Sequence, residues 1–185
     1  MFPSLMQQNP LMISSIIEFA ERWHPDVEVV SRTTEGPIHR YTYSEMGTRA
    51  RQLASSLSGL GIEKGDRVAT LAWNGYRHLE LYYGVSGSGA VLHTLNPRLF
   101  AEQMTYVIKH AGDKVIFTDL TFVPILESLK DKLTTVEHIV IMTDSKHMPD
   151  TTLDNVHCYE DLLASGTKDY PVSYTHLTLP TILRV

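Results

Sequence analysis

The sequence contains a single cysteine, Cys158, among its 185 residues. One cysteine forms neither an internal disulfide nor a paired-cysteine metal site, so a reducing compartment fits best. Basic residues are also few, with 16 Lys and Arg against 21 Asp and Glu and a formal net charge of -5. Because this balance provides no broad positive surface for phosphates, we expect no nucleic-acid partner.

Long hydrophobic runs are absent as well. Residues 1–23 have no basic leader, and Pro10 and Glu18 interrupt their apolar positions. The sequence therefore predicts neither a signal peptide nor a transmembrane segment, and we expect a cytoplasmic protein. Hydrophobic residues still make up 43% of the chain, which is typical of a globular domain with a buried core.

Apolar periodicity predicts alternating strands and helices along the chain. A helix at 12–23 precedes a hairpin, with strands 28–33 and 38–43 around the turn Glu35-Gly36-Pro37, and then a helix capped by Ser44 and closed by Gly61. Further strands are expected at 67–73, 91–95, 114–118 and 138–143, and further helices at 76–90, 101–111, 122–133 and 160–163. The polar stretch 144–157 is expected to be a mobile loop. The predicted fold class is α/β, with an open, mainly parallel sheet, helices on both faces and a small N-terminal β-hairpin.

Three features of the sequence do not match the dinucleotide-binding, metal-binding or phosphate-binding patterns that they partly resemble. The glycines of residues 84–90 (GVSGSGA) lack the spacing of a dinucleotide-binding loop, and predict close packing of a helix on the sheet or a helix C-cap. The nine histidines show neither HxxxH nor HExxH spacing, so no metal site is predicted. Residues 165–168 (SGTK) lack the pattern of a Walker A loop and predict a solvated turn.

Candidate ligand-binding residues lie where the predicted strands end. In open parallel sheets, ligands bind outside the carboxyl ends of the strands. Those ends supply Trp73, Asn74, Asn96 and Arg98 as candidates, while no residue is assigned a catalytic role. Trp73 and the pair Tyr82-Tyr83 fit either a ligand pocket or the core between helix and sheet.

Several motifs in order resemble fatty-acyl-CoA synthetases of the adenylate-forming superfamily. Residues 41–46 (YTYSEM) resemble the early YTYxEL motif, with Met46 in place of Leu, and residues 65–68 (GDRV) resemble the turn into the first core strand. Residues 87–99 (GSGAVLHTLNPRL) resemble the GAVxxxxNPRL segment, in wording typical of the medium- and long-chain fatty acid branch. The resemblance covers about residues 16–170, which is nearly the whole chain.

The resemblance implies a two-step ligase. The carboxylate of a fatty acid attacks the α-phosphate of ATP, giving acyl-adenylate and pyrophosphate, and the CoA thiol then displaces AMP. ATP, Mg²⁺ and CoA are therefore expected in the parent enzyme. The family's phosphate loop, adenine-side motif, hinge and catalytic lysine all lie downstream of the matching region. This chain is thus expected to be an N-terminal part, inactive alone and a poor binder of these cofactors.

Two alternatives to that interpretation stay open. One is a stand-alone flavodoxin-like module that binds a nucleotide without catalysis. The other is a dimerisation module, because exposed strand edges such as those of the hairpin invite pairing. The hairpin and the first helix would then form a homodimer interface.

The end of the chain differs from the rest. Residues 172–181 (VSYTHLTLPT) do not resemble the family and look like the translation of a sequencing adapter. The dense β-formers and alternating pattern also fit a β-strand. The expected division is a partial AMP-binding domain at 1–170 and an artefactual tail at 171–185.

Overall fold

The computed structural model describes residues 12–170, so the expected tail at 171–185 lies outside the described residues. The helices are α1 (Ile13–Trp23), α2 (Tyr43–Gly59), α3 (Tyr76–Ser88), α4 (Ala101–Ala111), α5 (Val123–Leu129) and α6 (Tyr159–Ala164), with 3₁₀ turns at Leu120–Phe122 and Lys130–Lys132. The strands are β1 (Glu28–Arg32), β2 (Ile38–Thr42), β3 (Arg67–Leu71), β4 (Val91–Thr94), β5 (Asp113–Thr118), β6 (His138–Ile141) and β7 (Val156–Cys158). Within this range, no helix has the length and apolar character needed to cross a membrane.

Strands β3 to β7 form one sheet in the order β4-β3-β5-β6-β7, and every neighbouring pair is parallel. This confirms the predicted open parallel sheet. The expectation of a loop throughout 144–157 is wrong at its end, because β7 begins at Val156 and pairs with β6. A strand of three residues is too short to show a periodicity, and the sheet edge that β6 offers decides its conformation.

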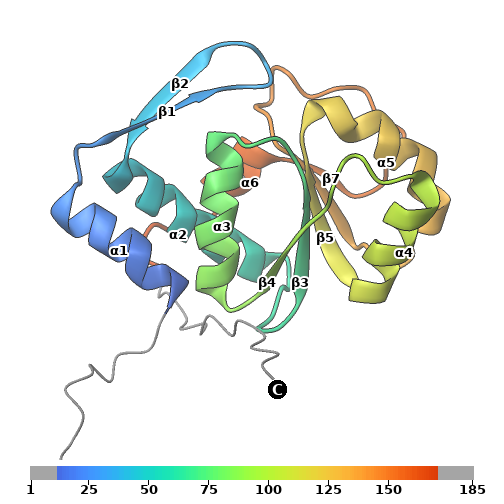
Figure 1. The fold of residues 1–185 in the computed structure, drawn as a ribbon, viewed down its shortest axis with the longest axis horizontal. Helices are drawn as coiled ribbons and strands as arrows, with labels where there is room; N and C mark the ends of the chain where they lie inside the picture. Colours follow the sequence, from blue (N-terminus) through green and yellow to red (C-terminus); the bar gives the residue numbers. More distant parts are fainter. Residues whose placement is uncertain (1–11, 171–185) are drawn as a thin grey trace, which may run out of the picture.

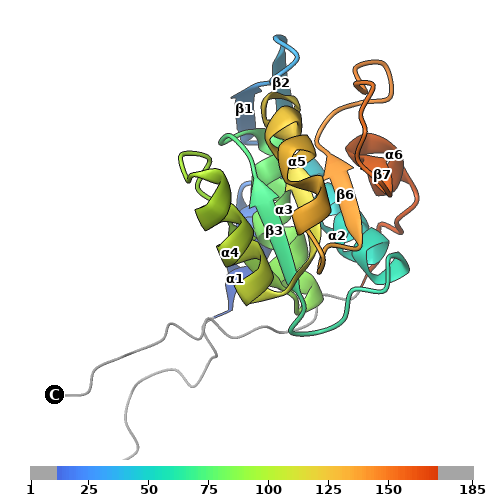
Figure 2. The same cartoon turned by 90° about the vertical axis from the view of Figure 1, so that its right-hand side faces the viewer.

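Helices cover both faces of this sheet, as Figures 1 and 2 show. Side chains alternate along each strand, so neighbouring residues enter opposite layers. One layer lies under α4 and α5 and includes Ala69, Ile116, Ile139, Met104 and Leu126. The other lies under α2, α3 and α6 and includes Val68, Phe117, Val140, Leu57 and Tyr159.

The N-terminal elements form a third cluster away from the sheet. Helix α1 packs on α2 and α3, where Ile17 meets Met46 and Ala50. The β1–β2 hairpin is antiparallel, as predicted, and lies above these helices in Figure 1. Its turn is closed by the Thr33 N–H, which donates to the Pro37 carbonyl at 2.9 Å.

The start of α2 differs from the expectation. Thr42, rather than Ser44, is the N-cap, and the helix begins at Tyr43. The Thr42 hydroxyl accepts the Glu45 N–H at 3.2 Å, and the Glu45 carboxylate accepts the Thr42 N–H at 2.8 Å. Of Thr42 and Ser44, Thr42 alone has a glutamate three residues later, and this glutamate allows both bonds of a capping box.

The small residues of α3 have the two predicted roles, with one correction. Gly89 ends the helix in the left-handed conformation, at φ 89°. A Cβ on Gly84 would lie 2.8 Å from Leu53 Cδ2 and 2.9 Å from the Ala50 carbonyl oxygen. The close approach is therefore to α2 and not to the sheet. The helix expected at 122–133 is also divided, into α5 and the flanking 3₁₀ turns.

Candidate functional site at the carboxyl edge of the sheet

The strand order places a topological switch point beside β3. Strand β4 lies on one side of β3 and β5 on the other, so the five strands in chain order are arranged as 2-1-3-4-5, the flavodoxin-like order. The connections run over opposite faces, through α3 on one and α4 on the other, and leave a crevice outside the carboxyl ends of β3 and β5. The segment 72–75 and Asp119 occupy those two ends.

Asp119 joins the two strand ends. Its carboxylate accepts the backbone N–H of Trp73 at 2.6 Å, and the residue is only 6% exposed. Burial raises the pKa of Asp119 to about 6, against the opposing effect of the Trp73 hydrogen bond. The Trp73 ring packs on Phe122, with centroids 5.1 Å apart, yet stays 52% exposed rather than entering the core. The switch point thus carries a carboxyl group whose pKa is raised to about 6.

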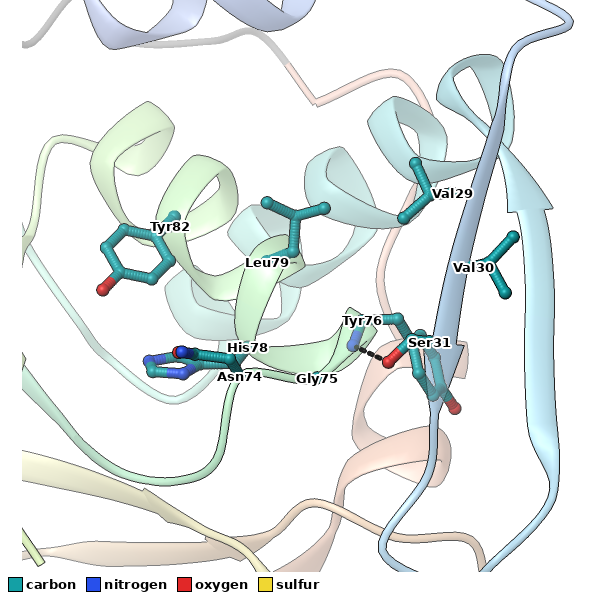
Figure 3. A pocket seen from close by; sticks show the side chains of 9 residues that line it. All are labelled: Val29, Val30, Ser31, Asn74, Gly75, Tyr76, His78, Leu79 and Tyr82. Carbon is teal, nitrogen blue, oxygen red and sulfur yellow. Dashed lines mark hydrogen bonds between the residues drawn. The ribbon is translucent and has the colours of Figure 1, made fainter.

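Two hollows adjoin this point. The smaller, about 40 Å³, is lined by Trp73, Asn74, Arg77 and Asp119 among others. The larger, about 300 Å³, opens between β1 and the start of α3 and also includes Asn74, as Figure 3 shows. Asn74 therefore lines both.

Asn96 and Arg98 line neither hollow. The Asn96 side chain accepts the Arg98 N–H at 3.0 Å, which shapes the turn after β4. The structure thus brings two of the four candidates together and leaves the other two at a neighbouring strand end. Ligand binding by any of the four stays a prediction.

A buried ionic network beside the hollows escaped the sequence analysis. Arg77 donates from Nη1 to Glu35 at 2.8 Å and from Nε to Glu160 at 2.8 Å. Thr143 also donates to Glu35, at 2.8 Å. Burial alone would raise the pKa of both Glu35 and Glu160, but their hydrogen bonds and the guanidinium groups beside them hold both pKa values below the ordinary range. The hairpin turn is thereby fastened to α3, α6 and the end of β6.

The network continues beneath α3. Arg49 donates from Nε to Glu80 at 2.7 Å and from Nη2 to Glu160 at 3.0 Å, while the Tyr159 hydroxyl donates to Glu80 at 2.7 Å. Glu80 is 0% exposed, and burial raises its pKa although Arg49 and Tyr159 act in the opposite direction. The sequence signal was the presence of charged residues, Arg77 and Glu80, within the predicted helix at 76–90, and it does not identify their partners.

The charged side chains near the carboxyl edge of the sheet already have partners. Arg49 and Arg77 already bind carboxylates, and Asp119 already accepts a backbone N–H. In residues 12–170, no group of three or more His, Cys, Asp and Glu side chains could hold a metal ion. The two arginines and Asp119 at this edge are thus already engaged with other groups of the protein. No step of a reaction is assigned to them.

Comparison with known proteins identifies relatives that are acyl-activating enzymes by name or family. The profile described as AMP-binding enzyme matches residues 17–173. The medium-chain-fatty-acid–CoA ligase of Ectopseudomonas oleovorans is 46% identical over 165 residues, covering 89% of this chain and 30% of the relative. The 3-methylmercaptopropionyl-CoA ligase of Ruegeria lacuscaerulensis is 43% identical over 165 residues, covering 89% and 31%. The chain thus spans about a third of the length of these relatives.

A solved structure agrees in fold. The N-terminal domain of FACL13 from Mycobacterium tuberculosis matches with a TM-score of 0.72 at 25% identity, covering 88% of this chain and 38% of that one. The predicted α/β fold of the adenylate-forming enzymes is confirmed, as is the resemblance to fatty acid–CoA ligases. The chain belongs to the AMP-binding enzyme family.

Proposed function

We propose that this chain is the N-terminal part of a cytoplasmic acyl-CoA ligase. That enzyme uses ATP and Mg²⁺ to activate a fatty acid and then transfers the acyl group to CoA. The observation that supports the proposal is 43–46% identity to two acyl-CoA ligases across 89% of the chain. The named acids of those relatives differ, so the chain length of the acid is not part of the proposal.

The part contributed by this chain is structural support. The sheet holds the segment 72–75 and Asp119 in place, and the Arg77 network fixes the hairpin above them. Phosphate binding and charge stabilisation need preorganised donors, which the described residues use for one another. The chain alone is therefore expected to form no acyl-adenylate.

A chimera tests this proposal. Residues 12–170 replace the matching segment of the E. oleovorans ligase, and ATP–pyrophosphate exchange is measured with octanoate. The chimera should be active and the 185-residue chain alone inactive. A folded chimera without exchange activity would refute the proposed family activity, whereas turnover by the chain alone would refute the assignment of a purely supporting role.

The flavodoxin-like strand order favours a second candidate, a stand-alone nucleotide-binding module. Such a module would gain stability from its ligand, by about 2.7 kcal/mol when the ligand is at about a hundred times its Kd. We expect no thermal shift of the chain with ATP, AMP or CoA, and a saturable shift would favour this candidate instead.

We also propose that the chain forms a homodimer through its N-terminal region. Ile16, Phe19 and Trp23 of α1 are 54%, 57% and 63% exposed and recur at helical spacing. Light scattering of the purified chain, and of a Phe19→Glu variant, distinguishes a dimer through α1 from a monomer.

A further inference from the structure

The walls of the 300 Å³ pocket include no arginine or glutamate of the ionic network, although the hydroxyl of the lining residue Tyr76 donates to Glu160 at 3.0 Å. Its walls come from β1 and from the first two turns of α3, and Figure 3 shows Val29, Leu79 and Tyr82 around its upper part. Val30 and Tyr82 are 51% and 44% exposed. Val29 and Leu79 pack in part against the third cluster, which includes Ile17 and Tyr41, and the pocket opens beside them.

No side chain that lines this pocket carries a formal charge at neutral pH. Eight of its nine lining residues are Val, Ser, Asn, Gly, Leu or Tyr, and the ninth is His78. Burial lowers the pKa of His78, so this imidazole is neutral.

Both nitrogens of His78 are also engaged. Nδ1 lies 3.1 Å from the Trp73 carbonyl oxygen, which can only accept, so Nδ1 carries the proton. Nε2 then accepts from the Thr70 hydroxyl at 3.0 Å. The imidazole thus offers its ring face, rather than a proton or a charge, to an occupant of the pocket.

Five lining residues carry polar side chains, namely Ser31, Asn74, Tyr76, His78 and Tyr82, of which the Tyr76 hydroxyl and both nitrogens of His78 already have partners. The Ser31 oxygen accepts the Tyr76 N–H at 3.1 Å, as drawn in Figure 3, which leaves its own hydroxyl proton available to another acceptor. Mostly apolar walls with a small number of polar groups are typical of small-molecule sites.

We infer that this pocket binds an uncharged aliphatic group with at most one hydroxyl or carbonyl oxygen near Ser31. The volume of about 300 Å³ accommodates roughly ten heavy atoms, each at about the 30 Å³ of a liquid water molecule. A carboxylate is not part of the ligand because no cation lines the pocket. The inference is independent of the ligase activity proposed above, since it concerns binding to this chain alone.

Straight-chain alcohols provide the test. The ¹⁵N-labelled 185-residue chain is titrated with 1-butanol, 1-hexanol, 1-octanol and 1-dodecanol, and backbone amide shifts are followed. Affinity should rise by up to about fourfold per added methylene, because each buried CH₂ contributes roughly 0.8 kcal/mol. The rise should stop near roughly ten heavy atoms. The amides of Ser31, Gly75 and Leu79 should show the largest shifts.

Two tyrosines supply a matched pair of variants. Tyr82 lines the pocket and Tyr106 does not, while both are exposed on helices and both contact a histidine ring one turn away, tilted for Tyr82 and stacked for Tyr106. Tyr82→Asp should weaken 1-octanol binding at least tenfold, and Tyr106→Asp should leave it within twofold. Equal loss in both variants would overturn the location.

Three further outcomes would overturn the inference. They are the absence of saturable shifts, affinity that still rises from 1-octanol to 1-dodecanol at the fourfold rate, and octanoate binding tenfold more tightly than 1-octanol. The last would reveal a cation in the site. Leu79→Trp, which fills the pocket without adding charge, should abolish the shifts while the dispersed spectrum of the folded protein persists.

Discussion

The two faces of the central sheet are stabilised in different ways. Under α4 and α5, the layer consists of hydrocarbon side chains such as Leu126, Ile108 and Ile116, all fully buried. Under α2, α3 and α6, the apolar layer ends in a network of two arginines and three glutamates. Packing fills space on the first face, whereas paired charges on the second specify where the hairpin and α6 dock.

Among the variants considered, Arg77→Ala should cause the largest loss in the free energy of unfolding. It leaves the buried Glu35 carboxylate, whose side chain is 4% exposed, without its cation. Removing one partner of a buried pair typically costs about 3–5 kcal/mol. Urea unfolding of the chain at about pH 7, followed by circular dichroism, measures the loss. The control is Arg40→Ala, which breaks the exposed Arg40–Glu28 pair of the same hairpin and should cost less than about 1 kcal/mol. Equal losses would show that burial of the network is unimportant.

Leu126→Ala tests the hydrocarbon face. The side chain is 0% exposed, so its truncation removes buried methyl groups and leaves a cavity. The expected loss is about 2–5 kcal/mol in the same urea experiment. Unlike that of Arg77→Ala, this loss should be insensitive to salt and to pH between about 5 and 8. A salt-dependent loss would contradict the separation of the two faces.

Asp119→Asn tests the raised pKa of the carboxyl group that follows β5 at the edge of the sheet. The folded state raises the pKa of Asp119 from 3.8 to about 6, so it binds the proton more tightly than the unfolded state. The contribution of this group to stability is therefore complete below pH 3.8 and is lost as the pH rises to about 6. The introduced side-chain amide can still accept the Trp73 N–H through its oxygen and carries no charge. The variant should be more stable than the parent by about 1–3 kcal/mol at about pH 8 and equal to it at about pH 3.5. If the variant and the parent unfolded with the same pH dependence, the raised pKa of Asp119 would be refuted.

Gly84→Ala gives the smallest effect and tests the packing of α3 on α2. The added methyl would meet the Ala50 carbonyl oxygen, which is part of a helix and cannot move aside. Overpacking of this kind costs about 1–3 kcal/mol, partly offset by about 1 kcal/mol of helix propensity. Gly59→Ala, in α2, is the matched control because nothing lies within 4 Å of its new methyl. That control should be neutral or slightly stabilising in the same urea measurement. A destabilisation equal to that of Gly84→Ala would mean that glycine is needed for backbone reasons alone.

The sequence was sufficient for the main elements and the sheet, because apolar periodicity and turn residues are local signals. The helix at 101–111 follows from such signals, whereas the helix expected at 76–90 ends earlier, at Ser88, before the Gly89 C-cap. β7 was missed because its three residues carry too little pattern, and the cap of α2 was misplaced by two residues. Of the candidate residues, Trp73 and Asn74 lie together beside one hollow, and their neighbour Asp119 was not among the candidates.

By itself the sequence determined the family, the α/β class and the strand ends at which to search. Only the tertiary structure decided which charges meet, since Arg49 and Glu160 are 111 residues apart in the chain and 3.0 Å apart in space. It also decided that Tyr82 and Val29 border one pocket. The physical reason is that periodicity reports which face of an element is buried, whereas pairing and cavities depend on which elements lie opposite each other.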